Sequence, residues 1–97
     1  MELTKKIESW AIQRGLDSAD PTRQMLKLIE ETGELANGMA RGNLDLIIDS
    51  IGDIYVVLTI LSMQLGLSIE ECIASSYEEI KNRKGKLVNG VFVKENE

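Results

Sequence analysis

The sequence contains no histidine, one cysteine, one proline and only four aromatic residues in 97 positions. Without histidine, imidazole catalysis is excluded, as are ferritin-like di-iron sites built on Glu-x-x-His. The single Cys72 cannot form an internal disulfide, and no thiolate zinc site is possible, which fits a reducing compartment. We interpret Cys72 as a small buried apolar residue.

Excess positive charge and long apolar runs are also missing. The net charge of −5, from 16 acidic and 11 basic residues, argues against a surface that neutralises a nucleic-acid backbone, so no nucleic-acid partner is expected. The longest apolar run, residues 54–61, is far shorter than the roughly 20 residues of a membrane span, and the N-terminal segment lacks a signal-like apolar core. We therefore predict a cytoplasmic protein with no membrane partner.

The remaining composition predicts one folded domain over residues 1–97. A hydrophobic fraction of 43% and a charged fraction of 28% are ordinary for a globular protein. A chain of this length buries only about 60–65% of its unfolded surface, so association with another copy would stabilise it.

Helix start and stop signals divide most of the chain into four helices. Thr4 is a candidate N-cap for a first helix that runs to about Arg14 and stops at Gly15. Asp20 and Pro21 are expected to begin a second helix that ends at Gly42.

The C-terminal half continues the pattern. A third helix is predicted over residues 44–65, and Ser68 with Glu71 forms a capping box for a fourth helix from Ile69 to about Lys84. The pair Asn89-Gly90 between β-forming residues predicts a small hairpin. The expected fold is all-α, a four-helix bundle with a C-terminal β-hairpin.

Apolar residues indicate which helix sides are buried. On the fourth helix Ile73, Tyr77 and Ile80 share one side, and residues 54–61 of the third are apolar nearly all round. One layer of neighbours cannot cover such a segment in so small a domain, so we predict a homodimer or tetramer whose interface completes the bundle. The broad apolar side expected for the second helix consists of Met25, Leu28, Ile29, Leu35, Ala36, Met39 and Ala40.

Acidic residues border these apolar sides. Glu30, Glu31 and Glu34 lie on the second helix, and Asp45, Asp49 and Asp53 follow at four-residue steps on the third. Carboxylates beside a core are costly to desolvate unless a hard divalent cation compensates them, which favours Mg²⁺, with Mn²⁺ as an alternative, and phosphate chemistry. The competing interpretation is an ordinary solvated helix face, above all for Glu30 and Asp45.

Basic and aromatic residues offer complementary functions. Basic residues lie at the end of the fourth helix and just after it, and on the second helix: Lys81, Arg83, Lys84 and Lys86, and Lys27 and Arg41. All of them could bind phosphates or simply be solvated. Trp10 fits either the core or a base-stacking position.

Two motifs resemble those of the MazG-like, all-α nucleoside triphosphate pyrophosphohydrolases, particularly the short phage-type members. They are residues 28–36, LIEETGELA, and residues 49–54, DSIGDI, and the similarity extends to Trp10, Arg14, Gly15 and Leu16 upstream and to residues 80–86 and 90–94 downstream. The resemblance implies a usually dimeric Mg²⁺-dependent enzyme that cleaves the α–β linkage of (d)NTPs to monophosphate and pyrophosphate.

Carried over by position, Glu31 and Glu34 are the first acidic pair and Asp53 closes the second. The position three before Asp53, commonly Glu in the family, is Ser50, and Asp49 is the candidate replacement. The resemblance thus implies that Glu31, Glu34, Asp49 and Asp53 bind metal, with Glu30 as an accessory or water-orienting acid. It also places the base near Trp10 and phosphates near Lys81 and Arg83, with Lys27 as a further phosphate-binding candidate.

A second function class competes with this hypothesis. A non-catalytic helical module that uses the apolar third helix to dimerise or bind a partner would show neither Mg²⁺ dependence nor nucleotide affinity.

Overall fold

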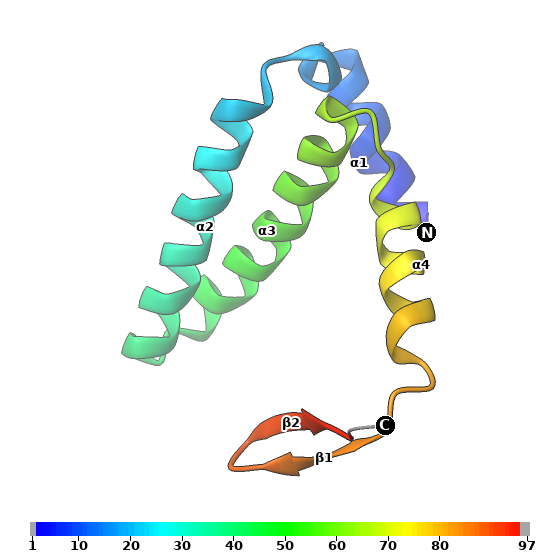
Figure 1. The fold of residues 1–97 in the computed structure, drawn as a ribbon. Helices are drawn as coiled ribbons and strands as arrows, with labels where there is room; N and C mark the ends of the chain where they lie inside the picture. Colours follow the sequence, from blue (N-terminus) through cyan, green and yellow to red (C-terminus); the bar gives the residue numbers. More distant parts are fainter. Residues whose placement is uncertain (1, 96–97) are drawn as a thin grey trace.

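A computed structural model describes residues 2–95 as four α-helices and a two-stranded antiparallel hairpin (Figure 1). In chain order these are α1 (Glu2–Gln13), a short 3-10 turn η1 (Leu16–Ser18), α2 (Pro21–Arg41), α3 (Leu44–Gln64), α4 (Ile69–Ile80), β1 (Gly85–Val88) and β2 (Val91–Lys94). The prediction of an all-α fold with a C-terminal hairpin is confirmed.

The longest helices, α2 and α3, form an antiparallel pair at one edge of the molecule (Figure 1). Asp20 caps α2 by accepting a hydrogen bond from the Thr22 amide, as predicted. Gly42, in the left-handed region, ends α2, and the Asn43 side chain accepts from the Leu46 amide to begin α3. This two-residue turn forces the helices to pack side by side.

Helix α1 packs against α3 on the side away from α2 (Figure 1). The prediction that Thr4 is the N-cap of the first helix was wrong. Thr4 lies inside α1 and is completely buried, and its hydroxyl shares a 2.6 Å hydrogen bond with the Tyr55 hydroxyl of α3. The Thr4 hydroxyl, which a local cap would have bonded to a backbone amide, is bonded instead to Tyr55, 51 residues away in the sequence. η1 is fixed similarly, because Gln64 Nε2 donates to the Leu16 carbonyl.

By length and composition α3 could cross a membrane, with a mean hydropathy of 1.8. Core helices pass the same test, and α3 has α1 and α2 packed on it. Its apolar segment is interrupted by buried Thr59, whose hydroxyl donates to the Tyr55 carbonyl one turn earlier. Within 54–61, Val57, Thr59 and Ile60 are buried and the other residues are half-buried.

Helix α4 differs from its predicted form in three ways. It ends at Ile80 rather than near Lys84, and the Ser68 side chain makes no capping hydrogen bond. Ile73, Tyr77 and Ile80 are all exposed, and so is Cys72, which was expected to be buried. After Ile69 the helix extends away from the other three helices (Figure 1), so the residues that the structure describes leave its apolar side exposed.

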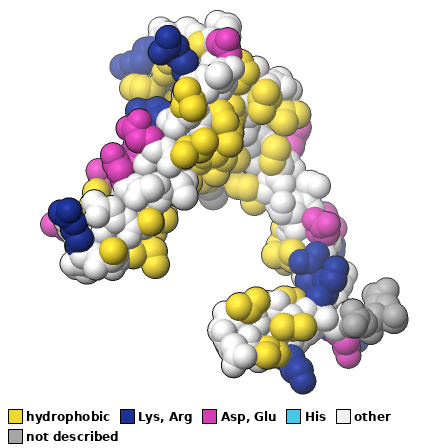
Figure 2. Space-filling model, turned by 60° about the vertical axis from the view of Figure 1, so that its left-hand side comes forward, with side chains coloured by type: hydrophobic (Ala, Val, Ile, Leu, Met, Phe, Trp, Pro, Cys, Tyr) yellow, Lys and Arg dark blue, Asp and Glu magenta, His cyan; other side chains and the backbone are white. Residues whose placement is uncertain are grey.

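The hairpin forms as predicted around Asn89-Gly90, both at positive φ. Its strands pair in register from Gly85–Lys94 to Val88–Val91, and every strand residue is exposed. An open concavity separates α4 and the hairpin from the α2–α3 pair, and yellow apolar side chains face it (Figure 2).

Candidate functional site

The predicted acidic residues converge on the contact between α2 and α3. A Cβ added to Gly38 would lie 3.3 Å from the Ile47 amide nitrogen, so the two backbones approach closely at this point. The helices are antiparallel, so positions before Gly38 on α2 lie beside positions after Ile47 on α3. About two turns from this contact, Glu31 is therefore level with Asp53. Charge interaction between these carboxylates is consistent with that register.

The acids occupy one side of this contact. At about 100° per residue, Glu30 and Glu34 lie beside the seam on α2, and Asp49 and Asp53 lie on the same side of α3. Glu30, Glu34 and Asp49 are exposed and Asp53 is half-buried. We call these four residues the acidic flank.

Glu31 sits inside the seam and is only 7% exposed. Its Oε2 is buried without a hydrogen-bond partner. Desolvation raises the pKa of Glu31, and the nearby charges of Glu34, Asp53 and Glu30 raise it further, opposed by Lys27. Within residues 2–95, Lys27 therefore compensates the charge of this carboxylate only in part.

Within residues 2–95, no three acidic, histidine or cysteine side chains are close enough together to hold a metal ion. The chemistry of the donors nevertheless fits a hard cation, because carboxylate oxygens are the ligands that Mg²⁺ prefers and the buried Glu31 oxygen lacks any other partner.

Ser50 and Asp49 are separated by the structure. Ser50 is 1% exposed, and within residues 2–95 its hydroxyl has no hydrogen-bond partner. Asp49 points to solvent on the acidic flank, one turn before Asp53. Asp49 is thus on the same side as the other acids of the flank, whereas Ser50 is enclosed.

Trp10 lies on α1, across α3 from α2 (Figure 1). The residue is 45% exposed, and the Arg14 guanidinium carbon lies 4.2 Å from the ring centroid. Arg14 also donates to the Trp10 carbonyl at 3.1 Å. This is a cation–π pair at the surface, and in one chain it is not next to the acidic flank.

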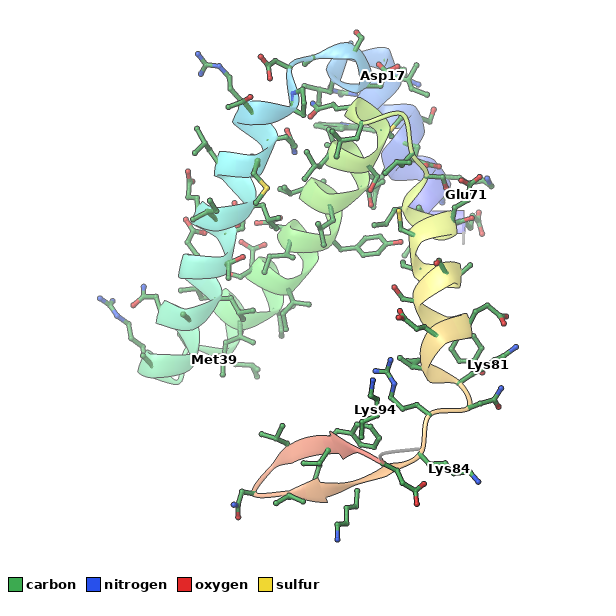
Figure 3. All side chains as sticks on the ribbon, in the orientation of Figure 1. Asp17, Met39, Glu71, Lys81, Lys84 and Lys94 are labelled. Atoms are coloured by element: carbon green, nitrogen blue, oxygen red, sulfur yellow. The ribbon has the colours of Figure 1, made fainter. Side chains whose placement is uncertain are left out.

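The predicted phosphate-binding residues are divided between two places. Lys27 lies one turn before Glu31, close enough to lower the pKa of that carboxyl. Lys81 lies at the end of α4, in the chain's extended C-terminal part (Figure 3), and Arg83 follows it two residues later. Lys81 Nζ is 2.6 Å from Glu78 Oε2, an exposed ion pair that a ligand could replace.

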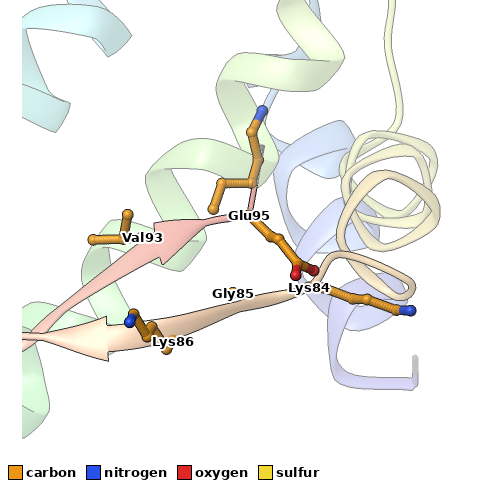
Figure 4. A pocket seen from close by; sticks show the side chains of 6 residues that line it. Lys84, Gly85, Lys86, Val93 and Glu95 are labelled. Carbon is orange, nitrogen blue, oxygen red and sulfur yellow. The ribbon is translucent and has the colours of Figure 1, made fainter. Parts of the chain in front are cut away.

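A hollow of about 380 Å³ lies at the base of the hairpin (Figure 4). Three lysines from separate sequence positions line it, which gives it a positive character. Lys94 was not identified from the sequence as a candidate; only its cross-strand pairing with Gly85 brings it beside Lys84. The lining residues are Lys84, Gly85, Lys86, Val93, Lys94 and Glu95.

Comparison with known proteins gives one family and one informative relative. Residues 19–88 match the family model described as MazG nucleotide pyrophosphohydrolase domain. An uncharacterized 18.2 kDa protein in the rep-hol intergenic region of Haemophilus phage HP1 is 48% identical over 64 residues, which are 65% of this chain and 39% of that protein. The chain thus spans well under half of that relative's length. No solved structure matches.

Proposed function

Because the chain belongs to the MazG nucleotide pyrophosphohydrolase family, we propose that it is a Mg²⁺-dependent hydrolase of (d)NTPs. The reaction cleaves the α–β phosphate linkage and releases the monophosphate and pyrophosphate. The observation that carries this proposal is Glu31, a buried carboxylate with an unpartnered oxygen beside Glu34 and Asp53. A cation bound there would compensate all three.

The acidic residues have different proposed roles, according to their positions. Glu31, Glu34, Asp49 and Asp53 would hold the metal through carboxylate oxygens, Mn²⁺ being an alternative to Mg²⁺. Bound Mg²⁺ neutralises phosphate charge and favours deprotonation of the attacking water. Glu30, which is exposed on the same flank, would act as an accessory acid that orients the water.

Substrate binding needs positive charge and a surface for the base. Lys27, adjacent to Glu31, would attract the phosphates directly. Lys81 and Arg83 would bind phosphate oxygens, and Trp10 would stack on the base with the ring face that Arg14 leaves open. The remaining parts of this proposal are a homodimeric or tetrameric assembly in the cytoplasm and a single MazG-like domain over residues 1–97.

Pyrophosphate release from a panel of canonical and modified dNTPs tests the reaction, with Mg²⁺, with Mn²⁺ and with EDTA. Metal-dependent release of pyrophosphate with an equal amount of monophosphate is the expected result. No release, together with no rise in melting temperature on adding Mg²⁺ and a non-hydrolysable dNTP analogue, would favour the non-catalytic helical module instead.

Glu34→Ala and Asp53→Ala test the residue assignment. Each should lower kcat/KM by about 10²-fold or more, since electrostatic stabilisation of the transition state is lost. The control is Asp45→Asn, which removes an exposed charge from the first turn of the same helix, outside the acidic flank. Circular dichroism should show an unchanged helical fold in all three, and retained turnover in either alanine variant would refute the assignment.

A further inference from the structure

Among residues 2–95, three buried side-chain oxygens have no hydrogen-bond partner: Glu31 Oε2, Ser50 Oγ and Gln64 Oε1. The Gln64 amide is already anchored, because its Nε2 donates to the Leu16 carbonyl at 2.9 Å. The other two residues belong to the helices that form the seam, Glu31 to α2 and Ser50 to α3. A buried polar atom without a partner is unfavourable for folding, so each of these two oxygens requires an explanation.

Other hydroxyl groups inside these helices bond to their own backbone. Those of Thr32, Thr59 and Ser62 each donate at 2.8 Å to the carbonyl four residues earlier, which is a usual partner of serine and threonine in a helix. Within the part of the chain that the structure describes, the Ser50 hydroxyl makes no such bond to the Leu46 carbonyl. Its donor and its acceptor capacity are therefore both available to a bound group.

The position of Ser50 places this hydroxyl along the same contact as the buried glutamate. Ser50 shares a side of α3 with Ile47, which packs against Gly38 of α2, so Ser50 faces α2 as well. Its exposure of 1% agrees with a place inside the seam. At 1.5 Å per residue, Ser50 and Glu31 are about 6 Å apart along the seam, and Asp53 lies one turn after Ser50.

We propose that Ser50 is a positioning residue for the metal ion and that its hydroxyl binds a water molecule held by that ion. The inference rests on the proposed function, which supplies the cation. Mg²⁺ keeps several of its waters in proteins, and a metal-bound water donates hydrogen bonds that a serine oxygen accepts. Serine is shorter than the glutamate common at this position in the family, so a water would span the remaining distance. Asp49 would then replace the charge of that glutamate, and Ser50 with its water would replace its reach into the seam.

Binding of Mn²⁺ to the whole chain tests this role, with isothermal titration calorimetry or the EPR signal of free Mn²⁺ as the measurement. Ser50→Ala should weaken Mn²⁺ binding by about 10-fold or more, the usual effect of removing a residue that holds a metal's direct ligands in place. The control is Ser62→Ala, on the same helix, where the buried hydroxyl already bonds to the Leu58 carbonyl. This control variant should bind Mn²⁺ with the affinity of the wild type.

Thermal melting separates this role from a structural one. Ser50→Ala removes a buried hydroxyl that lacks a partner, so its melting temperature in EDTA should be higher than that of the wild type. Added Mg²⁺ should raise the melting temperature of the wild type more than that of Ser50→Ala, because the wild type binds the ion more tightly. A residue that only supports the fold would not move stability without metal and affinity for metal in opposite directions.

Two results would overturn the inference. One is an equal Mn²⁺ affinity of the wild type and Ser50→Ala. The other is a lower melting temperature of Ser50→Ala in EDTA, or loss of its helical circular dichroism, since the hydroxyl would then serve the metal-free fold.

Failure of this inference can be told apart from failure of the proposed function. If the wild type binds Mn²⁺ and releases pyrophosphate while Ser50→Ala binds Mn²⁺ equally well, only the role of Ser50 is refuted. If the wild type binds no Mn²⁺, the proposed metal-dependent function and the role of Ser50 are both refuted.

Discussion

At the scale of single residues, the burial of Glu31 is unfavourable for folding, and this is the reason to regard its position as a binding site. A glutamate in a helix seam would ordinarily be replaced by an apolar residue, because burial disfavours its charged form. Here desolvation, followed by the charges of Glu34 and Asp53, raises the pKa of Glu31, while Lys27 lowers it only in part. Its buried Oε2 also lacks a partner. The position therefore destabilises the metal-free protein.

This cost predicts a pH-dependent stability in EDTA. Since the native pKa of Glu31 lies above its unfolded value, the native state binds the extra proton, and wild-type stability falls as pH rises through this range. Glu31→Gln removes the titration. Its melting temperature should match the wild type near pH 4 and exceed it at pH 7–8, by about 4–8 °C if the relief is about 1 kcal/mol.

Two comparisons make the Glu31 experiment specific. Glu30→Gln removes a charge of the same sign from the exposed neighbouring position and should leave the pH profile close to wild type. Added Mg²⁺ should raise the melting temperature of the wild type more than that of Glu31→Gln, because a ligand of the native state stabilises it in proportion to its binding. A parallel pH profile for wild type and Glu31→Gln would contradict our account.

Sequence patterns located the acidic residues but not their separate environments. The four-residue spacing of Asp49 and Asp53 was enough to place both on one side of α3. The burial of Ser50 was not foreseen, because it depends on which part of a broad apolar stripe α2 contacts. On α2 that stripe is wider than the seam: Leu28 and Leu35 lie beside it, while Ile29 and Met39 are exposed.

At the scale of helices and strands, the α2–α3 contact depends on Gly38. An alanine in mid-helix usually gains about 1 kcal/mol over glycine. At Gly38, however, the added Cβ would lie 3.2 Å from Ile47 Cγ1 and 3.3 Å from the Ile47 backbone nitrogen, which cannot move without shifting α3. Overpacking of this kind costs about 1–3 kcal/mol, so Gly38→Ala should destabilise the protein by about 1 kcal/mol.

Gly33 provides the matched control on the same helix. A Cβ at Gly33 would meet nothing within 4 Å in the chain, so Gly33→Ala should stabilise by about 0.5–1 kcal/mol. Urea unfolding of both variants measures the difference. If both variants raise the free energy of unfolding equally, the two helices are not packed as closely at Gly38 as the structure has them.

The helix boundaries also show where local signals suffice. Asp20-Pro21, Gly42-Asn43 and Asn89-Gly90 act through their own backbone and nearest neighbours, and all three produced the predicted structure. Thr4 failed as a cap because its hydroxyl is bonded to Tyr55, a contact that no local pattern encodes. Ser68 begins α4 without the predicted side-chain bond.

At the scale of the whole molecule, the sequence and the single chain differ most in α4. The period of Ile73, Tyr77 and Ile80 correctly indicates a helix with one apolar side, yet that side is exposed. Periodicity predicts that an apolar side will be covered but does not identify what covers it. In the homodimeric or tetrameric assembly proposed above, a second copy would cover this side of α4.

The proposed homo-oligomer predicts how the melting temperature depends on protein concentration and on salt. The melting temperature should rise with protein concentration, because folding and association are coupled by mass action. Salt between 0.05 and 0.5 M should lower it at fixed concentration, since the charge of +4 on residues 81–95 and the charge of −3 on residues 21–64 are screened. The decrease should be partial, because apolar contacts persist in salt. Differential scanning calorimetry measures both dependences, and a concentration-independent melting temperature would indicate that a monomer with these exposed apolar side chains is stable in water.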